Sequence, residues 1–336
     1  MVTSKDVARV AGVSQSTVSY VMSGRRPISE ETRRRVEAAI EQLTYQPNAG
    51  ARALASQRTR VVGLVVPFET HDNSGLLPFI ETIAACAREQ DHDVLLVTAD
   101  EGAAGLSRLA GRSLCDAIVM MDIEAADDRI PVAAALSVPV ILIGVPDDPA
   151  GLHCVDLDFA LAGRMAVDEL VACGHRRIVQ IGHSVADVER GVNYVGRFLS
   201  GTTAAAAEHG VDHHLVAPVA AGRAGIAAAV DEALAVGGER PGITIPHSGA
   251  IQQVLQELHE RGLDAGRDLS VVGLCTDVVA EAMIPPVSNV SMEPRDVSRR
   301  AMQILFRLLD RTEQRPAGRV ELVAPRMTLR RTTLPH

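Results

Sequence analysis

Apolar residues recur at helical spacing in three short stretches of the first 45 residues, which predicts three short helices over residues 3–45. The residues expected to cap them are Thr3 or Ser4, Ser14 and Ser29. Gly12 ends the first helix, because glycine readily adopts the left-handed backbone of a helix C-terminus. The apolar residues expected to face inward are Val7, Val10, Ala11, Val18, Val21, Met22, Val36, Ile40 and Leu43.

The first two helices and the turn between them fit a helix-turn-helix. Ala8 is small where the helices cross, Gly12 supplies the turn, and Val18 fills the junction. In this motif the N-terminal residues of the second helix approach base edges in the major groove. The side chains left pointing outward are Gln15, Ser16, Thr17, Ser19 and Tyr20. The pattern alone also allows three core helices of some other domain.

Beyond Arg60 the pattern changes to continuous apolar runs that alternate with helical stretches, which is typical of a doubly wound α/β fold. The predicted strands are 61–66, 93–98, 117–121, 138–143, 177–181, 242–245 and 269–273. The predicted helices are 77–90, 158–173, 196–209, 222–236, 249–261 and 295–310. The length of this body, residues 60–332, suits two lobes, and a ligand would bind between them beyond the carboxyl ends of the strands.

Charge is unevenly distributed along the 336 residues. The chain carries a formal net charge of −9, but its first 60 residues hold ten basic and five acidic residues, a surplus of +5 that leaves −14 elsewhere. A basic head on an acidic body indicates that a small module meets phosphates, although a solvated helix face would show the same split.

Composition narrows the class of protein further. The five cysteines are scattered without a Cys-x-x-Cys pair, which indicates reduced thiols in the cytoplasm rather than a zinc site. No apolar run reaches the ~18 residues of a membrane-spanning helix, and we see no secretory h-region. Hydrolase, phosphate-loop and dinucleotide-binding motifs are missing, so we predict neither an enzyme nor a cofactor. His213-His214 is expected in a solvated connection rather than in a metal site.

A run of residues in the head resembles the DNA-binding head of the LacI/GalR family of transcription regulators. The matching elements are Asp6-Val7-Ala8, Ala11-Gly12-Val13-Ser14, Thr17-Val18-Ser19, Thr32-Arg33 and Tyr45-x-Pro47-Asn48. In the body, Gly174-His175-Arg176-Arg177-Ile178, Ser270-Val271-Val272-Gly273 and Pro285-Pro286 match the family's effector core. The resemblance therefore covers nearly the whole chain and implies a core like the periplasmic sugar-binding fold.

The resemblance also implies roles for residues of the head. The family's base-reading positions correspond to Gln15, Ser16 and Tyr20. Contacts to the DNA backbone, which set register without reading sequence, are expected from Thr3, Ser14, Thr17, Ser19 and Asn48.

Residues 47–59 form the link between the head, residues 1–46, and the body. Asn48 can cap a helix of about two turns, which is too short to be stable alone. In the family this segment is the hinge helix, and the residue at Leu54 wedges into the central step of the minor groove, with Ala51 one turn earlier on the same face. The alternative is a plain linker with Leu54 docked on the body.

The effector site departs from the family pattern. The expected ligand-binding residues are Phe68, Thr70, Asn193, Arg197, His247 and Cys275. The acidic residues usual near Ser248 and at Cys275 are missing, as is the aromatic residue usual near 219–221, which argues against an ordinary sugar. Arg197 would suit an anionic or carbonyl ligand, unless it forms an ion pair on the surface of a lobe. Cys275 is more simply a buried inert thiol than an oxidant sensor, and the pocket could also have lost its ligand.

Three functions compete for these features. The favoured one is a sequence-specific transcription regulator, expected to be a repressor, that binds a near-palindromic operator as a homodimer and responds to a small effector between its lobes. A cytoplasmic solute-binding or sensor protein, whose DNA binding is not controlled by ligand, is the alternative. A hydrolase on an α/β body is third, and it lacks a nucleophile with a neighbouring base.

Overall fold

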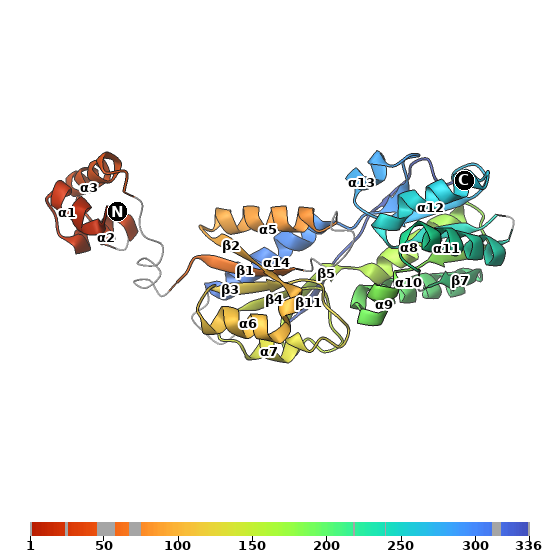
Figure 1. The fold of residues 1–336 in the computed structure, drawn as a ribbon, viewed down its shortest axis with the longest axis horizontal. Helices are drawn as coiled ribbons and strands as arrows, with labels where there is room; N and C mark the ends of the chain where they lie inside the picture. The colour runs from red at the N-terminus through yellow and green to blue at the C-terminus, as the bar shows by residue number, and fades with distance from the viewer. Residues whose placement is uncertain are drawn as a thin grey trace. The chain divides into compact units, whose positions relative to one another are not determined.

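A computed structural model of the chain describes residues 2–23, 26–45, 58–66, 75–217, 219–238, 240–310 and 317–334. The chain divides into two compact units, Met1–Arg60 and Val61–His336 (Figure 1). The expected hinge residues Asn48, Ala51 and Leu54 and the expected ligand residues Phe68 and Thr70 lie outside the described residues. Within those described residues, no helix is both long and apolar enough to cross a lipid bilayer.

The first unit contains the three predicted helices. They are α1 (Ser4–Ala11), α2 (Gln15–Ser23) and α3 (Glu30–Gln42). Val7, Val18 and Val36 are each fully buried and form the centre of a small core with the alanines beside them. The predictions for Val10 and Met22 were wrong, because these side chains are 41% and 38% exposed. Three short helices enclose a small volume, which the buried valines and alanines fill, and the neighbouring apolar positions remain outside.

The second unit begins with a lobe built on a six-stranded sheet. Its strands, in spatial order, are β11 (Val320–Val323), β5 (His153–Leu157), β4 (Val140–Ile143), β3 (Ala117–Met120), β1 (Val61–Val66) and β2 (Asp93–Thr98). Each strand runs parallel to its neighbours. Such strands are covered by helices on both faces, which explains why the central strands β1, β3 and β4 are apolar throughout.

The helices that cover the first lobe are α5 (Leu77–Glu89), α6 (Gly102–Gly111), α7 (Arg129–Ala135) and α14 (Pro294–Leu309). Helices α5 and α14 pack on one face of the sheet, and α6 and α7 pack on the other (Figure 1). Helix α14 follows the second lobe in the sequence, so the first lobe is completed by a segment from the far end of the chain.

The second lobe repeats this architecture around another six-stranded sheet. Its strands, in spatial order, are β12 (Met327–Thr328), β10 (Ser288–Val290), β9 (Ser270–Leu274), β8 (Gly242–Ile245), β6 (Arg177–Ile181) and β7 (Asp212–Val216), of which β12 is antiparallel. The helices are α8 (Phe159–Ala172), α9 (Val185–Arg190), α10 (Asn193–His209), α11 (Gly222–Gly237), α12 (Ser248–Glu260) and α13 (Asp277–Ala282). Helices α8 and α10 pack on one face of this sheet, and α11 and α12 on the other.

Helices α8 and α10 pack unusually close together. A Cβ atom added to Gly201 of α10 would lie 2.0 Å from the carbonyl oxygen of Ala160, so no larger residue fits there. This close packing holds the middle of α10 against the start of α8.

The chain passes between the lobes three times, after Leu157, after Val290 and after Val323. The predicted doubly wound, two-lobed body is confirmed. The prediction that His213-His214 lie in a polar connection was wrong, because both residues belong to the edge strand β7. The sequence pattern had also missed β5, a buried strand that carries a histidine and an aspartate among its apolar residues.

Candidate functional site

The turn between α1 and α2 is fixed by local hydrogen bonds. The backbone N–H and the hydroxyl of Thr3 both donate to the Asp6 carboxylate, at 3.0 and 2.7 Å, and these bonds hold the pKa of Asp6 below its usual value. Gly12 adopts a φ of +66°, which allows Val13 N–H to donate to Ala8 O at 3.0 Å. A residue with a side chain would be strained there. The chain therefore enters α2 at a defined angle.

The start of α2 presents a row of polar side chains. Ser14 accepts from the backbone N–H of Thr17 at 3.1 Å and so caps the helix as predicted. The side-chain amide of Gln15 donates to the Ser4 hydroxyl at 2.8 Å, which orders it across the turn. Gln15, Ser16 and Ser19 are exposed, and Tyr20 is half-buried with the Arg26 guanidinium 5.0 Å above its ring. Glutamine and serine on an accessible helix N-terminus can hydrogen-bond base edges and phosphates.

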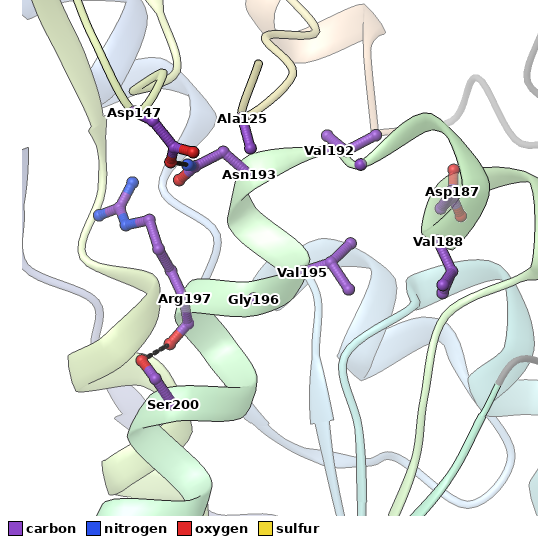
Figure 2. A pocket seen from close by; sticks show the side chains of 11 residues that line it. Ala125, Asp147, Asp187, Val188, Val192, Asn193, Val195, Gly196, Arg197 and Ser200 are labelled. Carbon is purple, nitrogen blue, oxygen red and sulfur yellow. Dashed lines mark hydrogen bonds between the residues drawn. The ribbon is translucent and has the colours of Figure 1, made fainter.

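A cavity of about 430 Å³ lies where the first turn of α10 meets the first lobe (Figure 2). Two of the expected ligand residues, Asn193 and Arg197, line it. The remaining lining residues are Ala125, Asp147, Asp187, Val188, Gly191, Val192, Val195, Gly196 and Ser200. The cavity therefore combines polar side chains with an apolar wall, which is typical of a small-molecule site.

Side chains from both lobes meet at this cavity. The side-chain amide of Asn193 donates to Asp147 at 3.2 Å, and Arg190 forms an ion pair with Asp122. The backbone adds a direct link, because Ala125 N–H donates to Gly191 O at 2.8 Å. The contacts that hold the lobes together thus lie beside the cavity.

Arg197 forms an ion pair that is more buried than a surface pair. Its guanidinium donates to Asp156 of β5 at 2.7 Å and to the Leu157 carbonyl at 3.1 Å, and it lies 5.8 Å from the centre of the Phe159 ring. Burial raises the pKa of Asp156 to about 6, although the Arg197 charge opposes this rise. Much of the Arg197 charge is already compensated within the protein, which weakens the case for an anionic ligand.

His247 and Cys275 do not line the cavity. His247 precedes α12, and its ring centre lies 6.4 Å from that of His183, which sequence reasoning missed. His183 is 2% exposed, and its ring nitrogens have no hydrogen-bond partner in the part of the chain that the structure describes. Burial lowers the pKa of His183 to about 4. Cys275 is fully buried among core residues, and burial raises its pKa to about 12, which is the environment of an inert thiol.

Three carboxylates of this region were not predicted. Asp147 lies just beyond strand β4, a position where ligand groups are expected in such folds, so the strand pattern could have indicated it. Asp156 and Asp187 could be found only through the tertiary structure, since one sits in the missed strand β5 and the other in the short helix α9. Within the described part of the chain, no group of three or more His, Cys, Asp or Glu side chains is arranged to hold a metal ion.

Comparisons with known proteins agree with this architecture. Residues 3–48 match the family model for bacterial regulatory proteins of the lacI family, and residues 167–333 match the periplasmic binding protein-like domain. Catabolite control protein A of Priestia megaterium is 28% identical over 321 residues, which cover 92% of this chain and 93% of that protein.

Two solved structures share the fold of the whole chain. One is a Lac repressor dimer bound to operator and the anti-inducer ONPF, with a TM-score of 0.82 at 22% identity over 99% of each chain. The other is a complex of the transcriptional regulator CelR with cellobiose, with a TM-score of 0.67 at 24% identity over 99% of this chain and 100% of that one.

A helix-turn-helix head followed by a two-lobed periplasmic-binding-protein-like body defines a class of DNA-binding transcription regulators. The chain belongs to the LacI/GalR family of transcriptional regulators.

Proposed function

We propose that this regulator is a repressor that binds a near-palindromic operator as a homodimer in the cytoplasm. In this proposal residues 1–46 bind DNA, residues 47–59 form the hinge, and residues 60–332 pair two copies and bind an effector. The observation that carries the proposal is the exposed polar start of α2, where Gln15 and Ser16 follow the fixed turn at Gly12.

Within the head, two kinds of DNA contact are proposed. Gln15, Ser16 and Tyr20 would read base edges, because glutamine pairs with adenine in a bidentate way and hydroxyls reach either bases or phosphates. The proposed backbone contacts are Thr3, Ser14, Thr17, Ser19 and Asn48. Ala51 and Leu54 would enter the minor groove, where an apolar wedge partly unstacks the central base step.

Exposed apolar residues of the body support the homodimer. On the first lobe, Leu77 is 67% exposed at the start of α5, and Leu96 is 46% exposed on the edge strand β2. On the second lobe, Val278 of α13 and Ile284 are 71% and 81% exposed. The side-chain amide of Gln252 bonds both the N–H and the carbonyl of Ile284, at 3.0 and 3.2 Å, and so holds this residue outward. A symmetric partner would bury both patches.

The cavity at the start of α10 supports regulation by a small molecule. A ligand there would contact both lobes and would favour the lobe arrangement to which it binds more tightly. That arrangement would in turn decide whether the two hinge segments of a dimer can pack together.

Selection of bound sequences from random duplexes, followed by a band-shift titration, tests the proposed DNA binding. We expect a near-palindromic site and an affinity that falls by about a thousandfold between 50 and 200 mM salt, as expected for about six phosphate contacts. A chain without residues 1–56 should lose this binding while its body keeps its unfolding transition. Equal affinity for all duplexes, or unchanged binding after the deletion, would exclude the proposal.

A further inference from the structure

The cavity at the start of α10 has an excess of hydrogen-bond acceptors over donors. This excess indicates the chemistry of its ligand, and the inference rests on the proposed function, in which that ligand is the effector. Asp147 and Asp187 line the cavity, and in the described part of the chain no basic nitrogen lies within 4.0 Å of either carboxylate. Asp187 is 9% exposed and accepts from the Ser184 hydroxyl at 2.8 Å. A carboxylate that is largely removed from water is stabilised chiefly by a nearby positive charge.

Positive charge at the cavity is already engaged. Arg197 donates to Asp156 and to the Leu157 carbonyl, and Arg190 pairs with Asp122 and, at 3.4 Å, with Glu124. Among the described residues, these pairs leave Asp147 and Asp187 without a cationic partner. The surroundings are negative enough that the carboxylates of Asp187 and Asp122 add to the effect of burial in raising the pKa of Tyr194, the residue after Asn193.

The side chain of Asn193 supplies independent evidence that the cavity needs a hydrogen-bond donor from a ligand. Its amide nitrogen donates to Asp147, but its Oδ1 atom is buried and, among the residues that the structure describes, accepts no hydrogen bond. Reversing the amide would bring two oxygens together, so this orientation is fixed by the neighbouring carboxylate. A buried acceptor without a donor costs about 1–3 kcal/mol, and a donor-bearing ligand beside it would remove that cost.

The part of the lining between the two carboxylates is apolar. Figure 2 shows Asp147 and Asp187 on opposite sides of the cavity, with Val192 and Val195 between them. Val188 extends the wall beside Asp187 and is itself 41% exposed. An aliphatic chain complements such a wall, because it gains by leaving water.

We propose that the cavity binds a small aliphatic ligand that carries protonated amino groups, with Asp187 and Asp147 receiving the ammonium groups and the valines contacting the carbon chain. Carboxylate and phosphate ligands are excluded by the same negative charge. This replaces the anionic ligand that Arg197 alone suggested.

Three probes of equal chain length test the proposal by calorimetry on the full-length protein without DNA. They are 1,4-diaminobutane, 1,4-butanediol and succinate. We expect the diamine to bind at least about tenfold more tightly than the diol, with an affinity that falls as salt rises, and succinate not to bind. Because no DNA is present, failure here leaves the band-shift test of the proposed regulator unaffected.

Asp187→Asn and Asp147→Asn remove each charge while keeping a side chain that accepts hydrogen bonds, so the Ser184 contact is retained. Each should weaken the diamine by about tenfold or more and leave the diol unchanged. Asp296→Asn, an exposed aspartate of α14 that pairs with Arg299, is the matched control and should change neither. Equal binding of diol and diamine, tighter binding of succinate, unchanged affinity in both variants, or no heat from any probe at about 10 mM would overturn the proposal.

Discussion

Arg197 of α10 donates to Asp156 of β5 at 2.7 Å, and this ion pair joins the two lobes beside the ligand cavity. The two side chains are 20% and 12% exposed, so both charges have lost much of their hydration. An ion pair in such a position adds little net stability when complete, but it becomes costly when one partner is removed.

Arg197→Met should therefore lower the free energy of unfolding of the body by about 3 kcal/mol, because it leaves the Asp156 carboxylate buried without its cation. Asp156→Asn combined with Arg197→Met should recover most of this loss. Urea unfolding followed by far-ultraviolet circular dichroism measures both variants. Arg164→Met, which breaks the more exposed pair with Glu208, is the control and should cost less. If the two single variants lose the same free energy of unfolding, the burial of the Arg197 pair does not increase its contribution to stability.

The same pair makes stability depend on pH in a defined direction. Burial raises the pKa of Asp156 from 3.8 to about 6, so between these values the folded protein binds a proton that the unfolded chain has released. This contribution to stability is fully present below about pH 4 and is lost as the pH rises through about 6. Relative to Asp156→Asn, the natural protein should gain up to a few kcal/mol between pH 7 and pH 4.5. Urea midpoints of the two proteins measured across this range check the sign, and a constant difference would contradict it.

How much of the fold the sequence predicts depends on how each element is buried. Strand β1 is apolar throughout and is covered on both faces, so its pattern was unambiguous. Strands β5 and β7 include histidines and aspartates and lack a continuous apolar run, so local pattern could not identify them. In α1, helical spacing allowed both Val7 and Val10 to face inward, and only the packing of the three helices decided between them.

The candidate site divides in the same way. Asn193 and Arg197 were predicted from their place after a strand, and both line the cavity. The partners that determine their chemistry, Asp147 and Asp156, come from the other lobe. Because no local signal links the two sides, the charge balance of the cavity follows only from the tertiary structure.

Two valines of the head, one buried and one exposed, offer a matched pair of substitutions. Val18 of α2 is fully buried and Val10 of α1 is 41% exposed. Val18→Ala should destabilise the head by about 2 kcal/mol, from lost burial and the cavity left behind, whereas Val10→Ala should change stability by less than about 0.5 kcal/mol. Hydrogen exchange of the α3 amides, read by mass spectrometry, reports the head separately from the body. A similar loss of protection against exchange in both variants would contradict a packing in which Val18 is buried and Val10 is exposed.

The exposed patch on the second lobe leads to a prediction about assembly. Ile284→Glu places a charge on a residue that is 81% exposed, so the monomer should remain folded while a dimer that buries this side chain is weakened by about tenfold or more. Sedimentation velocity over a range of concentrations measures the change. Leu215→Glu, on the edge strand β7, alters an exposed apolar residue elsewhere and should leave the association constant unchanged. A natural protein that sediments as a monomer would contradict the proposed dimer itself.

The last prediction concerns the reading of bases by α2. Gln15 is exposed at the start of this helix and is ordered by its hydrogen bond to Ser4. Gln15→Ala should reduce affinity for the selected operator by about 1–3 kcal/mol and relax the preference at one base pair of each half-site, because a bidentate contact is lost. Binding to unrelated duplexes should not change, since that binding rests on phosphate contacts. Gln42→Ala, an exposed glutamine at the end of α3, is the control and should leave both affinities as they are. Band shifts on operator and random duplexes at one fixed salt concentration measure the ratio of the two affinities. An equal loss of affinity for both duplexes would assign Gln15 to a contact with the DNA backbone instead.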